Sequence, residues 1–246
     1  EGIFQAEGDF DIRLARDGAE AVALVKSFDP QVVTLDVQMP GMDGLACLSR
    51  IMIESPRPVV MISALTAEGA DATLQAMELG ATDFIAKPSG TVSLEIEEMR
   101  PLLVQKIRAA AHARISRSLR LRERIRHQLK VKTGPQVPPR TRITPLRDTT
   151  SGLVLIGTST GGPAALDIVL PQLPSHFPWP VMVAQHMPKG FTGAFAKRLD
   201  RHCALNVMEV VRPVPLVAGT IYIARGDADF IVSRRPSGLV AMPVPA

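Results

Sequence analysis

The sequence predicts an α/β protein built from two domains, each with a doubly wound parallel sheet. Aliphatic runs of strand length recur along the chain, and helix-length segments separate them. The 246 residues include 46% hydrophobic but only 4% aromatic residues, which favours aliphatic cores. This length is sufficient for two domains of ordinary size.

The first hundred residues alternate strand and helix signals. Strands are expected at residues 10–14, 32–35, 59–62 and 84–86. Helical periodicity fills the gaps at residues 19–28, 45–53 and 70–79. Such alternation predicts a parallel sheet with crossover helices.

Asp36, Ser63 and Lys87 each follow one of these predicted strands. Because parallel strands end at one edge of their sheet, a carboxylate, a hydroxyl and an ammonium are expected to converge there. Such a trio suits a carboxylate that accepts a phosphoryl group, with the other two groups binding the new phosphoryl oxygens. A buried Asp36–Lys87 ion pair without chemistry explains the trio equally well.

The run Leu-Asp-Val-Gln-Met-Pro-Gly-Met-Asp-Gly at residues 35–44, together with Lys87-Pro88, closely resembles the receiver domain of response regulators. The match covers nearly all of residues 1–90. The resemblance implies a flavodoxin-like fold in which Asp36 is the phosphoacceptor and a Mg²⁺ ligand. It further implies that Ser63 is the switch hydroxyl, Lys87 the cationic partner, and a sensor histidine kinase the phosphodonor.

The chain departs from the receiver pattern at its start. Receivers open with a strand that ends in a pair of acidic residues, which help to hold Mg²⁺. The present chain begins after that strand, and Glu7, Asp9 and Asp11 do not correspond to the pair. We therefore expect the first receiver strand to be missing, and we assign the Mg²⁺ requirement to the intact protein.

The basic residues are concentrated in the middle of the chain. Residues 101–150 hold 13 Lys and Arg against 2 Asp and Glu, whereas residues 1–100 hold 7 against 17. A nucleic-acid-binding arm is one interpretation. The segment lacks interleaved aromatics and any zinc or helix-turn-helix pattern, so a solvated basic linker is favoured and no nucleic acid is expected as partner.

Helical composition continues from residue 93 to about 130, and the Gly- and Pro-containing residues 133–139 then break regular structure. We therefore divide the chain into a first domain at residues 1–105, a basic helical and Pro-containing linker at 106–150, and a second domain at 151–246.

The second domain opens with a strand and a small-residue turn. Four aliphatic residues at 153–156 predict a strand covered on both faces, and Pro163 suits the first position of a helix. Ser159 lies on the turn between them. The turn lacks the Lys-Ser or Lys-Thr of a P-loop and the glycine spacing of a dinucleotide loop. A nucleophile held near backbone N–H groups and a tight turn with an N-capping hydroxyl remain as interpretations.

A second buried strand is expected at residues 181–184, and His186 follows it closely. With a helix at about 164–173 between the strands, the unit is β-α-β, so Ser159 and His186 are expected at one crevice. An imidazole within reach of a hydroxyl can activate it as a nucleophile. His186 could instead only satisfy a backbone carbonyl. A helix at 191–201 and a strand at 219–224 follow.

Four stretches, at residues 157–163, 185–192, 196–199 and 219–224, resemble the catalytic domain of the chemotaxis protein-glutamate methylesterases. A receiver joined to this Rossmann-like domain by a linker is that family's architecture. The resemblance implies hydrolysis of glutamate methyl esters on chemoreceptors, and often deamidation of glutamines. By motif, Ser159 is the nucleophile, His186 the general base and then acid, and the Thr160 N–H an oxyanion donor. No cofactor is expected for the esterase.

The family's third catalytic member is an aspartate in a glycine-rich segment near the carboxyl end, and this sequence stops at Ala246 before such a segment. We therefore expect the C-terminal part of the catalytic domain to be missing. Asp227 is not assigned to the triad, and Asp229 stands where the family often carries histidine. A response regulator whose second domain only binds partners is the alternative function, and a DNA-binding regulator is a weaker one.

Cys47 and Cys203 lie in different predicted domains without metal-ligand spacing, which favours a reduced cytoplasmic setting. No window reaches the length of a membrane span, and no secretory signal is present, so no membrane insertion is expected. We further hypothesise that the resting first domain covers the crevice of Ser159 and His186, and that phosphorylation at Asp36 shifts the population toward an open form.

Overall fold

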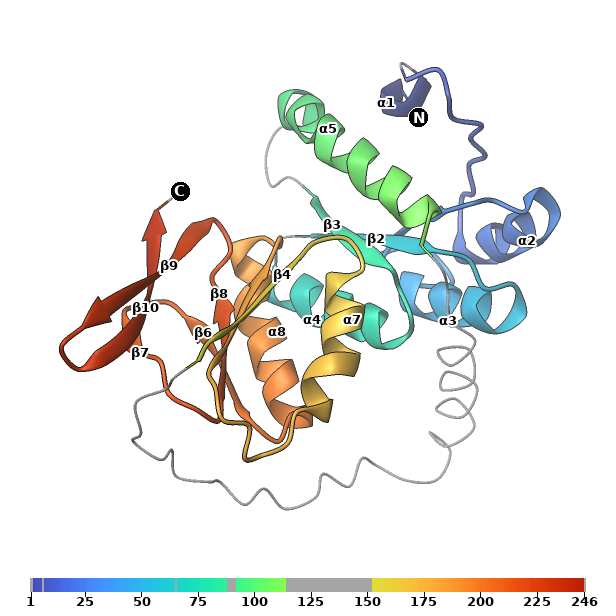
Figure 1. Cartoon of the computed structure of the whole chain (residues 1–246). Helices are drawn as coiled ribbons and strands as arrows, with labels where there is room; N and C mark the ends of the chain where they lie inside the picture. Colours follow the sequence, from blue (N-terminus) through green and yellow to red (C-terminus); the bar gives the residue numbers. More distant parts are fainter. Residues whose placement is uncertain (1, 6, 65, 88–91, 114–151, 246) are drawn as a thin grey trace. The chain divides into compact units, whose positions relative to one another are not determined.

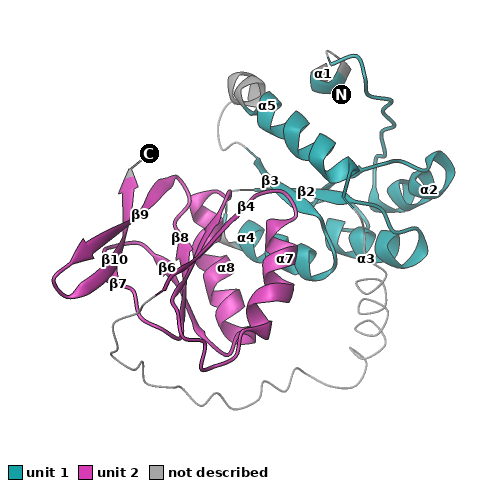
Figure 2. Ribbon diagram, viewed as in Figure 1, with its two compact units in different colours: residues 1–134 teal, residues 135–246 magenta. Residues whose placement is uncertain are grey.

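A computed structural model describes residues 2–245 except 6, 65, 88–91 and 114–151. The chain divides into two compact units, residues 1–134 and 135–246, which Figure 2 shows in separate colours. Residues 106–111 of the predicted linker form the end of a helix of unit 1, and the part from residue 114 onward lies outside the described residues, so its structure stays a prediction.

Unit 1 contains a parallel three-stranded sheet in the order β1-β2-β3. The strands are β1 (Val33–Asp36), β2 (Val59–Ala64) and β3 (Asp83–Lys87). Val33 pairs with Val59 and Val60 with Asp83, so all three strands run in one direction. Three of the four strands predicted for the first domain are confirmed.

Helices cover both faces of this sheet. α5 (Val92–Ala111) lies on one face, while α3 (Gly44–Glu54) and α4 (Ala67–Glu78) lie on the other (Figure 1). α2 (Gly18–Phe28) packs against α3, and a short helix α1 (Gly2–Gln5) begins the described chain. The three predicted helices correspond to α2, α3 and α4.

Side-chain caps define where these helices begin. Asp17 accepts hydrogen bonds from the N–H groups of the first turn of α2, and Asp43 and Thr66 do the same for α3 and α4. A capping oxygen satisfies a backbone donor that has no partner inside the helix. The helix starts are therefore fixed by local sequence.

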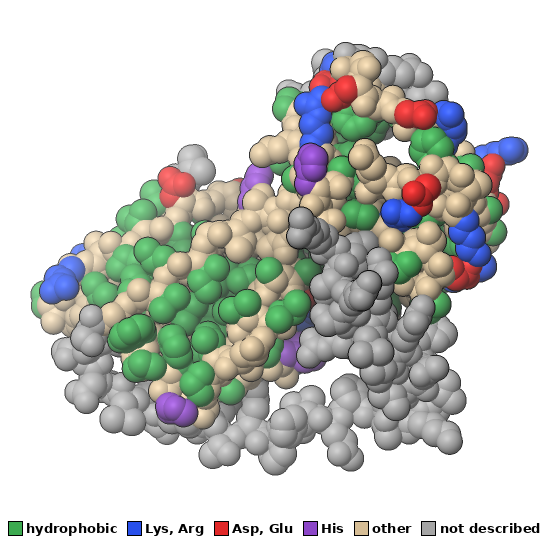
Figure 3. All heavy atoms as spheres, turned by 45° about the vertical axis from the view of Figure 1, so that its right-hand side comes forward, with side chains coloured by type: hydrophobic (Ala, Val, Ile, Leu, Met, Phe, Trp, Pro, Cys, Tyr) green, Lys and Arg blue, Asp and Glu red, His purple; other side chains and the backbone are tan. Residues whose placement is uncertain are grey.

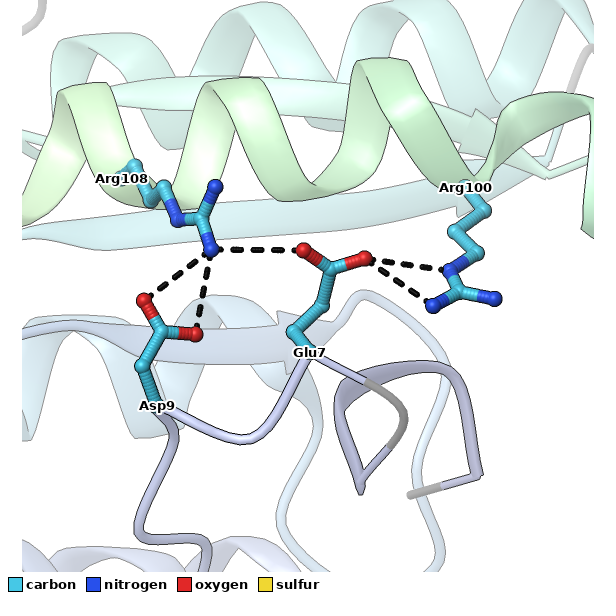
Figure 4. Close-up of polar contacts among 4 residues, drawn as sticks. All are labelled: Glu7, Asp9, Arg100 and Arg108. Carbon is cyan, nitrogen blue, oxygen red and sulfur yellow. Dashed lines mark hydrogen bonds and ion pairs between the residues drawn. The ribbon is translucent and has the colours of Figure 1, made fainter.

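The predicted strand at residues 10–14 is wrong. The described residues there have no strand hydrogen bonding, because no neighbouring described strand offers a ladder to them. Side chains hold this part of the chain instead: Glu7 accepts hydrogen bonds from Arg100 and Arg108, and Asp9 from Arg108 (Figure 4). The segment is thus attached to α5 rather than to the sheet.

Unit 2 contains a parallel four-stranded sheet in the order β4-β5-β8-β6. The strands are β4 (Val154–Thr158), β5 (Val181–Gln185), β8 (Thr220–Ala224) and β6 (Asn206–Val210). Helix α7 (Gly162–Val169) and the 3-10 turn η1 (Leu170–Gln172) connect β4 to β5, and α8 (Lys189–His202) connects β5 to β6. The predicted β-α-β unit is confirmed.

A second, antiparallel sheet was not predicted. β7 (Val214–Pro215), β10 (Gly238–Pro245) and β9 (Ala228–Arg235) pair in that order. Leu216 and Ala241 from this part of the chain are buried together with Met182, Val210 and Tyr222 of the parallel sheet. The antiparallel sheet therefore covers the apolar side chains on one face of β5, β6 and β8.

Strand β4 is covered less than its sequence predicts. Leu155 is 69% exposed, and its register partner Met182 is only 3% exposed. Both side chains point to one face, but β4 is an edge strand and no described residue covers Leu155. Nine of the ten exposed large hydrophobic residues in the described ranges belong to unit 2, and hydrophobic side chains are prominent on its visible surface (Figure 3).

Candidate functional site

The structure places Ser159 and His186 at the carboxyl ends of two neighbouring strands. Thr158 and Gln185 are the last register pair of β4 and β5, and Ser159 and His186 come directly after them. The His186 N–H donates to the Thr158 carbonyl at 3.0 Å, which continues the ladder by one bond. Both residues are exposed.

The turn that carries Ser159 is closed by the backbone. The Gly162 N–H donates to the Ser159 carbonyl at 2.8 Å, and Gly161 has a φ of +76°, which favours glycine. Pro163 lies in the first turn of α7, as predicted. Thr160 lies between Ser159 and this helix start, where unpaired N–H groups carry partial positive charge.

Gln185 was not recognised as a functional residue from the sequence. Its side chain is 6% exposed, and its Nε2 donates to the carbonyl oxygens of Ser159 at 3.1 Å and of His186 at 3.2 Å. Its Oε1 accepts a hydrogen bond from the Thr158 hydroxyl at 2.7 Å. An amide directly after an aliphatic strand and before the histidine was the available sequence signal.

A second polar cluster supports the segment after His186. Thr192 is fully buried, and its hydroxyl donates to Glu209 Oε1 at 2.6 Å and accepts the Gly226 N–H at 3.3 Å. A Cβ on Gly226 would lie 2.3 Å from the Met187 carbonyl oxygen, so only glycine fits there. The turn after β8 therefore packs directly on the chain that leaves His186.

Asp227 and Asp229 do not join Ser159 and His186 through any hydrogen bond between described residues. Asp227 has a φ of +59° and occupies the turn between β8 and β9, while Asp229 lies exposed in β9. Neither position supplies an observed third partner for the imidazole.

In unit 1 the structure brings Asp36 and Lys87 together. Asp36 ends β1 and Lys87 ends β3, and Lys87 Nζ lies 2.5 Å from Asp36 Oδ2. The other carboxylate oxygen, Oδ1, accepts the Gln38 N–H at 3.1 Å. The carboxylate is about one third exposed, with a side-chain exposure of 32%.

The third member of the predicted trio makes a different contact. Ser63 is 1% exposed, and its hydroxyl donates to the Gly69 carbonyl of α4 at 3.0 Å. The hydroxyl is therefore bound to α4, and the expectation that all three groups converge on one point is met only by Asp36 and Lys87 in this structure.

The described residues do not by themselves fit a Mg²⁺ ion. No group of three or more His, Cys, Asp or Glu side chains is found in the described part of the chain with a geometry that could hold a metal. Asp36 offers one carboxylate, and Glu7 and Asp9 are paired with arginines of α5. A cation preferring six oxygen ligands needs further donors.

None of the helices in the described residues combines the length and apolarity needed to cross a bilayer. Both cysteines, Cys47 and Cys203, are buried and free.

Family profiles match both units. Residues 1–97 match the response regulator receiver domain, and residues 154–244 match the CheB methylesterase family. Two solved structures are also similar. The response regulator domain of Thermotoga maritima CheB is 42% identical, covering 41% of this chain and 75% of that one, with a TM-score of 0.38. The CheB methylesterase catalytic domain of the same organism is 39% identical, covering 38% of this chain and 50% of that one, with a TM-score of 0.37.

Two relatives align with essentially the whole of this chain. The sequence is 63% identical over 251 residues to protein-glutamate methylesterase/protein-glutamine glutaminase 2 of Rhodopseudomonas palustris strain BisB18, covering 100% of this chain and 69% of the relative. It is 50% identical to such a protein of Rhodospirillum rubrum, covering 99% and 66%. This chain thus spans about two thirds of the length of these relatives. With its receiver domain preceding a methylesterase domain, the chain belongs to the CheB family of protein-glutamate methylesterases/protein-glutamine glutaminases.

Proposed function

We propose that the protein hydrolyses the methyl esters of glutamate side chains on chemoreceptors, using Ser159 as nucleophile and His186 as general base and then acid. The observation that carries the proposal is the placement of these two residues at adjacent strand ends, linked through the His186 N–H and the Thr158 carbonyl. The family name supplies the substrate class.

The proposed reaction has two steps. His186 accepts the Ser159 hydroxyl proton as the oxygen attacks the ester carbonyl carbon, and the C–O bond to the methoxy group breaks. His186 returns the proton to the leaving group, so methanol departs and an acyl-enzyme forms. Water then attacks the acyl carbon by the same route, which releases the glutamate carboxylate and regenerates Ser159.

The negative charge that develops on the ester oxygen needs donors. We propose the Thr160 N–H for this role, because Thr160 follows the nucleophile directly and lies two residues before α7 begins at Gly162, near the positive end of the helix dipole, which favours an anion. The chemistry uses a hydroxyl, an imidazole and backbone N–H groups, and we propose that it needs no cofactor.

The same constellation can act on an amide. The relatives are named for a glutaminase activity as well as for the esterase. For a glutamine side chain the leaving group is ammonia, which His186 protonates in the same way, and the acyl-enzyme is identical. We propose deamidation of receptor glutamines as a second activity of this site.

We propose that phosphorylation of Asp36 by a sensor histidine kinase controls this activity. The contact of Lys87 Nζ with Asp36 Oδ2 at 2.5 Å supports the proposal that Lys87 binds a phosphoryl oxygen on Asp36, and we propose that Ser63 acts as the switch hydroxyl once it leaves the Gly69 carbonyl. We propose that phosphorylation of the receiver domain uses Mg²⁺, to which Asp36 would supply one carboxylate ligand. We place the protein in the cytoplasm, where its substrates' methylated segments and its kinase would meet it.

The test is methanol release from methylated chemoreceptor by the full-length protein, compared with Ser159→Ala and His186→Gln. We expect both variants to lose turnover, since a triad member's loss costs on the order of 10⁴-fold or more in serine hydrolases. Unchanged turnover by Ser159→Ala would remove the proposed mechanism. Binding of receptor without turnover by the wild type would favour the non-catalytic binding module instead.

A further inference from the structure

The two catalytic candidates are joined by a single buried side chain. Gln185 Nε2 has two hydrogens, and the structure offers two acceptors for them: the carbonyl oxygens of Ser159 at 3.1 Å and of His186 at 3.2 Å. Both N–H groups of the amide therefore donate to backbone carbonyls of the proposed nucleophile and general base, Ser159 and His186.

The orientation of this amide is determined by its neighbours. Thr158 Oγ1 lies 2.7 Å from Gln185 Oε1 and donates to it, whereas both carbonyl oxygens can only accept. If the amide were rotated by half a turn, its oxygen would face two carbonyl oxygens and both would lose a donor. The hydrogen-bonding pattern thus permits one orientation only.

The space for the amide comes from a missing side chain. A Cβ on Gly162 would lie 2.0 Å from Gln185 Oε1 and 2.7 Å from Thr158 Cβ. Glycine at the first position of α7 is therefore needed for the Gln185 side chain to pass beneath the helix start. The same glycine therefore shapes both the turn after Ser159 and the space that the Gln185 side chain occupies.

These contacts lie where the sheet no longer fixes the chain. Thr158 and Gln185 are the last pair in register. Beyond this pair, the segment after β4 turns into α7 and the segment after β5 continues toward α8. The position of Ser159 relative to His186 then depends on a few bonds, of which Gln185 contributes two. Acyl transfer is sensitive to this spacing, because a displacement of about 1 Å can cost on the order of 10²-fold in rate.

We propose that Gln185 is a positioning residue for the reaction: its amide fixes the separation of the Ser159 turn and the His186 strand end. This inference rests on the proposed function above. Gln185 acts through the backbone of its two neighbours and, being buried, does not touch the substrate. Its loss should therefore lower kcat and leave KM near the wild-type value.

The primary variant is Gln185→Glu, which keeps the shape but places a carboxylate against two carbonyl oxygens. Gln185→Leu, which removes the polar group, guards against a loss specific to the added charge. We expect both to reduce kcat for methyl-ester hydrolysis by about 10²-fold and to slow labelling of Ser159 by a fluorophosphonate to a similar degree. Thr158→Val should give a smaller loss in the same direction, and Thr158→Ser should restore activity because the hydroxyl returns.

Tyr222→Phe is the matched control. Tyr222 is 1% exposed, and its hydroxyl bonds to the backbone of Pro215 and Val217 away from the Ser159 turn, so its loss removes a buried hydrogen bond of unit 2 without touching Ser159, His186 or Gln185. We expect it to lower stability but not kcat of the folded enzyme. If the Gln185 variants behaved like Tyr222→Phe, with kcat unchanged after correction for folded fraction, the positioning role would be refuted.

The outcome is separable from a failure of the proposed function. If Ser159→Ala retained ester turnover, the mechanism itself would be wrong, whatever the Gln185 variants did. If Ser159→Ala were inactive but Gln185→Glu and Gln185→Leu kept both wild-type kcat and wild-type labelling rate, only the present inference would fall.

Discussion

The Thr192 hydroxyl lies 2.6 Å from Glu209 Oε1, which joins the first turn of α8 to strand β6. The same hydroxyl accepts the Gly226 N–H, so three elements of unit 2 meet at one buried oxygen. Because the segment between His186 and α8 packs on Gly226, this cluster supports the backbone that follows His186 in the candidate active site.

Replacing Thr192 by valine should destabilise the protein. The change leaves the Glu209 carboxylate and the Gly226 N–H without this partner, and an unsatisfied buried polar group costs about 1–3 kcal/mol. Urea unfolding of the variant measures the loss. Thr192→Ser is the control, since it keeps the hydroxyl, and a valine variant as stable as the serine variant would contradict the expected role.

The ion pair between Lys106 and Asp83 makes a stability prediction for unit 1. Nζ of Lys106 lies 2.9 Å from Asp83 Oδ1, and the two side chains are 8% and 1% exposed. Lys106→Met should cost about 3–5 kcal/mol, because a buried carboxylate then loses its charge partner. The double variant Asp83→Asn with Lys106→Met should recover a large part of this loss. Additive losses in a double-mutant cycle would show that the two groups act independently.

Asp36 and Asp43 provide a matched pair for the receiver site. Asp36→Asn should abolish phosphoryl incorporation from the kinase, because the attacking carboxylate is gone. Asp43→Asn alters a carboxylate whose oxygen accepts the Ala46 N–H at the start of α3, and asparagine is a comparably good cap, so phosphorylation should persist. Phosphotransfer followed with radiolabelled phosphate distinguishes the two. Continued labelling of Asp36→Asn would assign the phosphoryl group to another residue.

Gly162→Ala should lower kcat, whereas a glycine-to-alanine substitution elsewhere in a helix should not. The new methyl group would occupy the place of the Gln185 amide, so it should act like the Gln185 variants on kcat. Gly190→Ala in α8 is the control, because no heavy atom other than those of its chain neighbours and its own helix backbone lies within 4 Å of the added Cβ. Alanine in a helix is intrinsically favoured over glycine by about 1 kcal/mol, so a loss of activity in Gly162→Ala alone would isolate the steric cause.

The buried thiol of Cys47 gives a prediction about pH. Burial raises the pKa of Cys47 from 9.0 to about 11, with the nearby carboxylates of Asp17 and Asp43 contributing in the same direction and Arg50 opposing. Below pH 9 the thiol keeps its proton in both states. As the pH rises from about 9 to about 11, the unfolded chain releases this proton first, so the free energy of unfolding falls.

Unfolding in urea under reducing conditions, below pH 9 and near pH 11, measures this effect. Cys47→Ala lacks the ionisable group, so its stability should fall less steeply with pH than that of the wild type. Equal slopes for the two proteins would show that Cys47 does not contribute to the alkaline loss of stability.

Several elements were predictable because their causes are local. The caps at Asp17 and Asp43 come directly before α2 and α3, close to the helix starts that periodicity predicts at residues 19 and 45, whereas Thr66 begins α4 at Ala67, ahead of the predicted start at residue 70. The β-α-β pattern predicts that Ser159 and His186 lie at one edge of the sheet, because right-handed crossovers bring the ends of parallel strands to the same edge.

Other features depend on neighbours that the local sequence does not reveal. Residues 10–14 have a strand-like pattern but no adjacent described strand to pair with. The β9–β10 hairpin was missed because Pro243 and Pro245 weaken the strand signal, although its antiparallel pairing runs from Gly238 to Pro245. Leu155 belongs to an aliphatic run that predicts a core residue, but it is exposed because it lies on an edge strand where no described residue packs over it.

The sequence by itself determined the two parallel α/β domains, the family, and the residue types that end their strands. It did so because hydrophobic periodicity, turn chemistry and motif spacing depend on residues that are close together in the sequence. Only the tertiary structure decided that the Ser63 hydroxyl binds α4 while Lys87 pairs with Asp36, and that Gln185 joins the Ser159 turn to the His186 strand end. Those choices depend on which donors and acceptors meet across separate elements and on the space that a glycine leaves, and no local pattern encodes either.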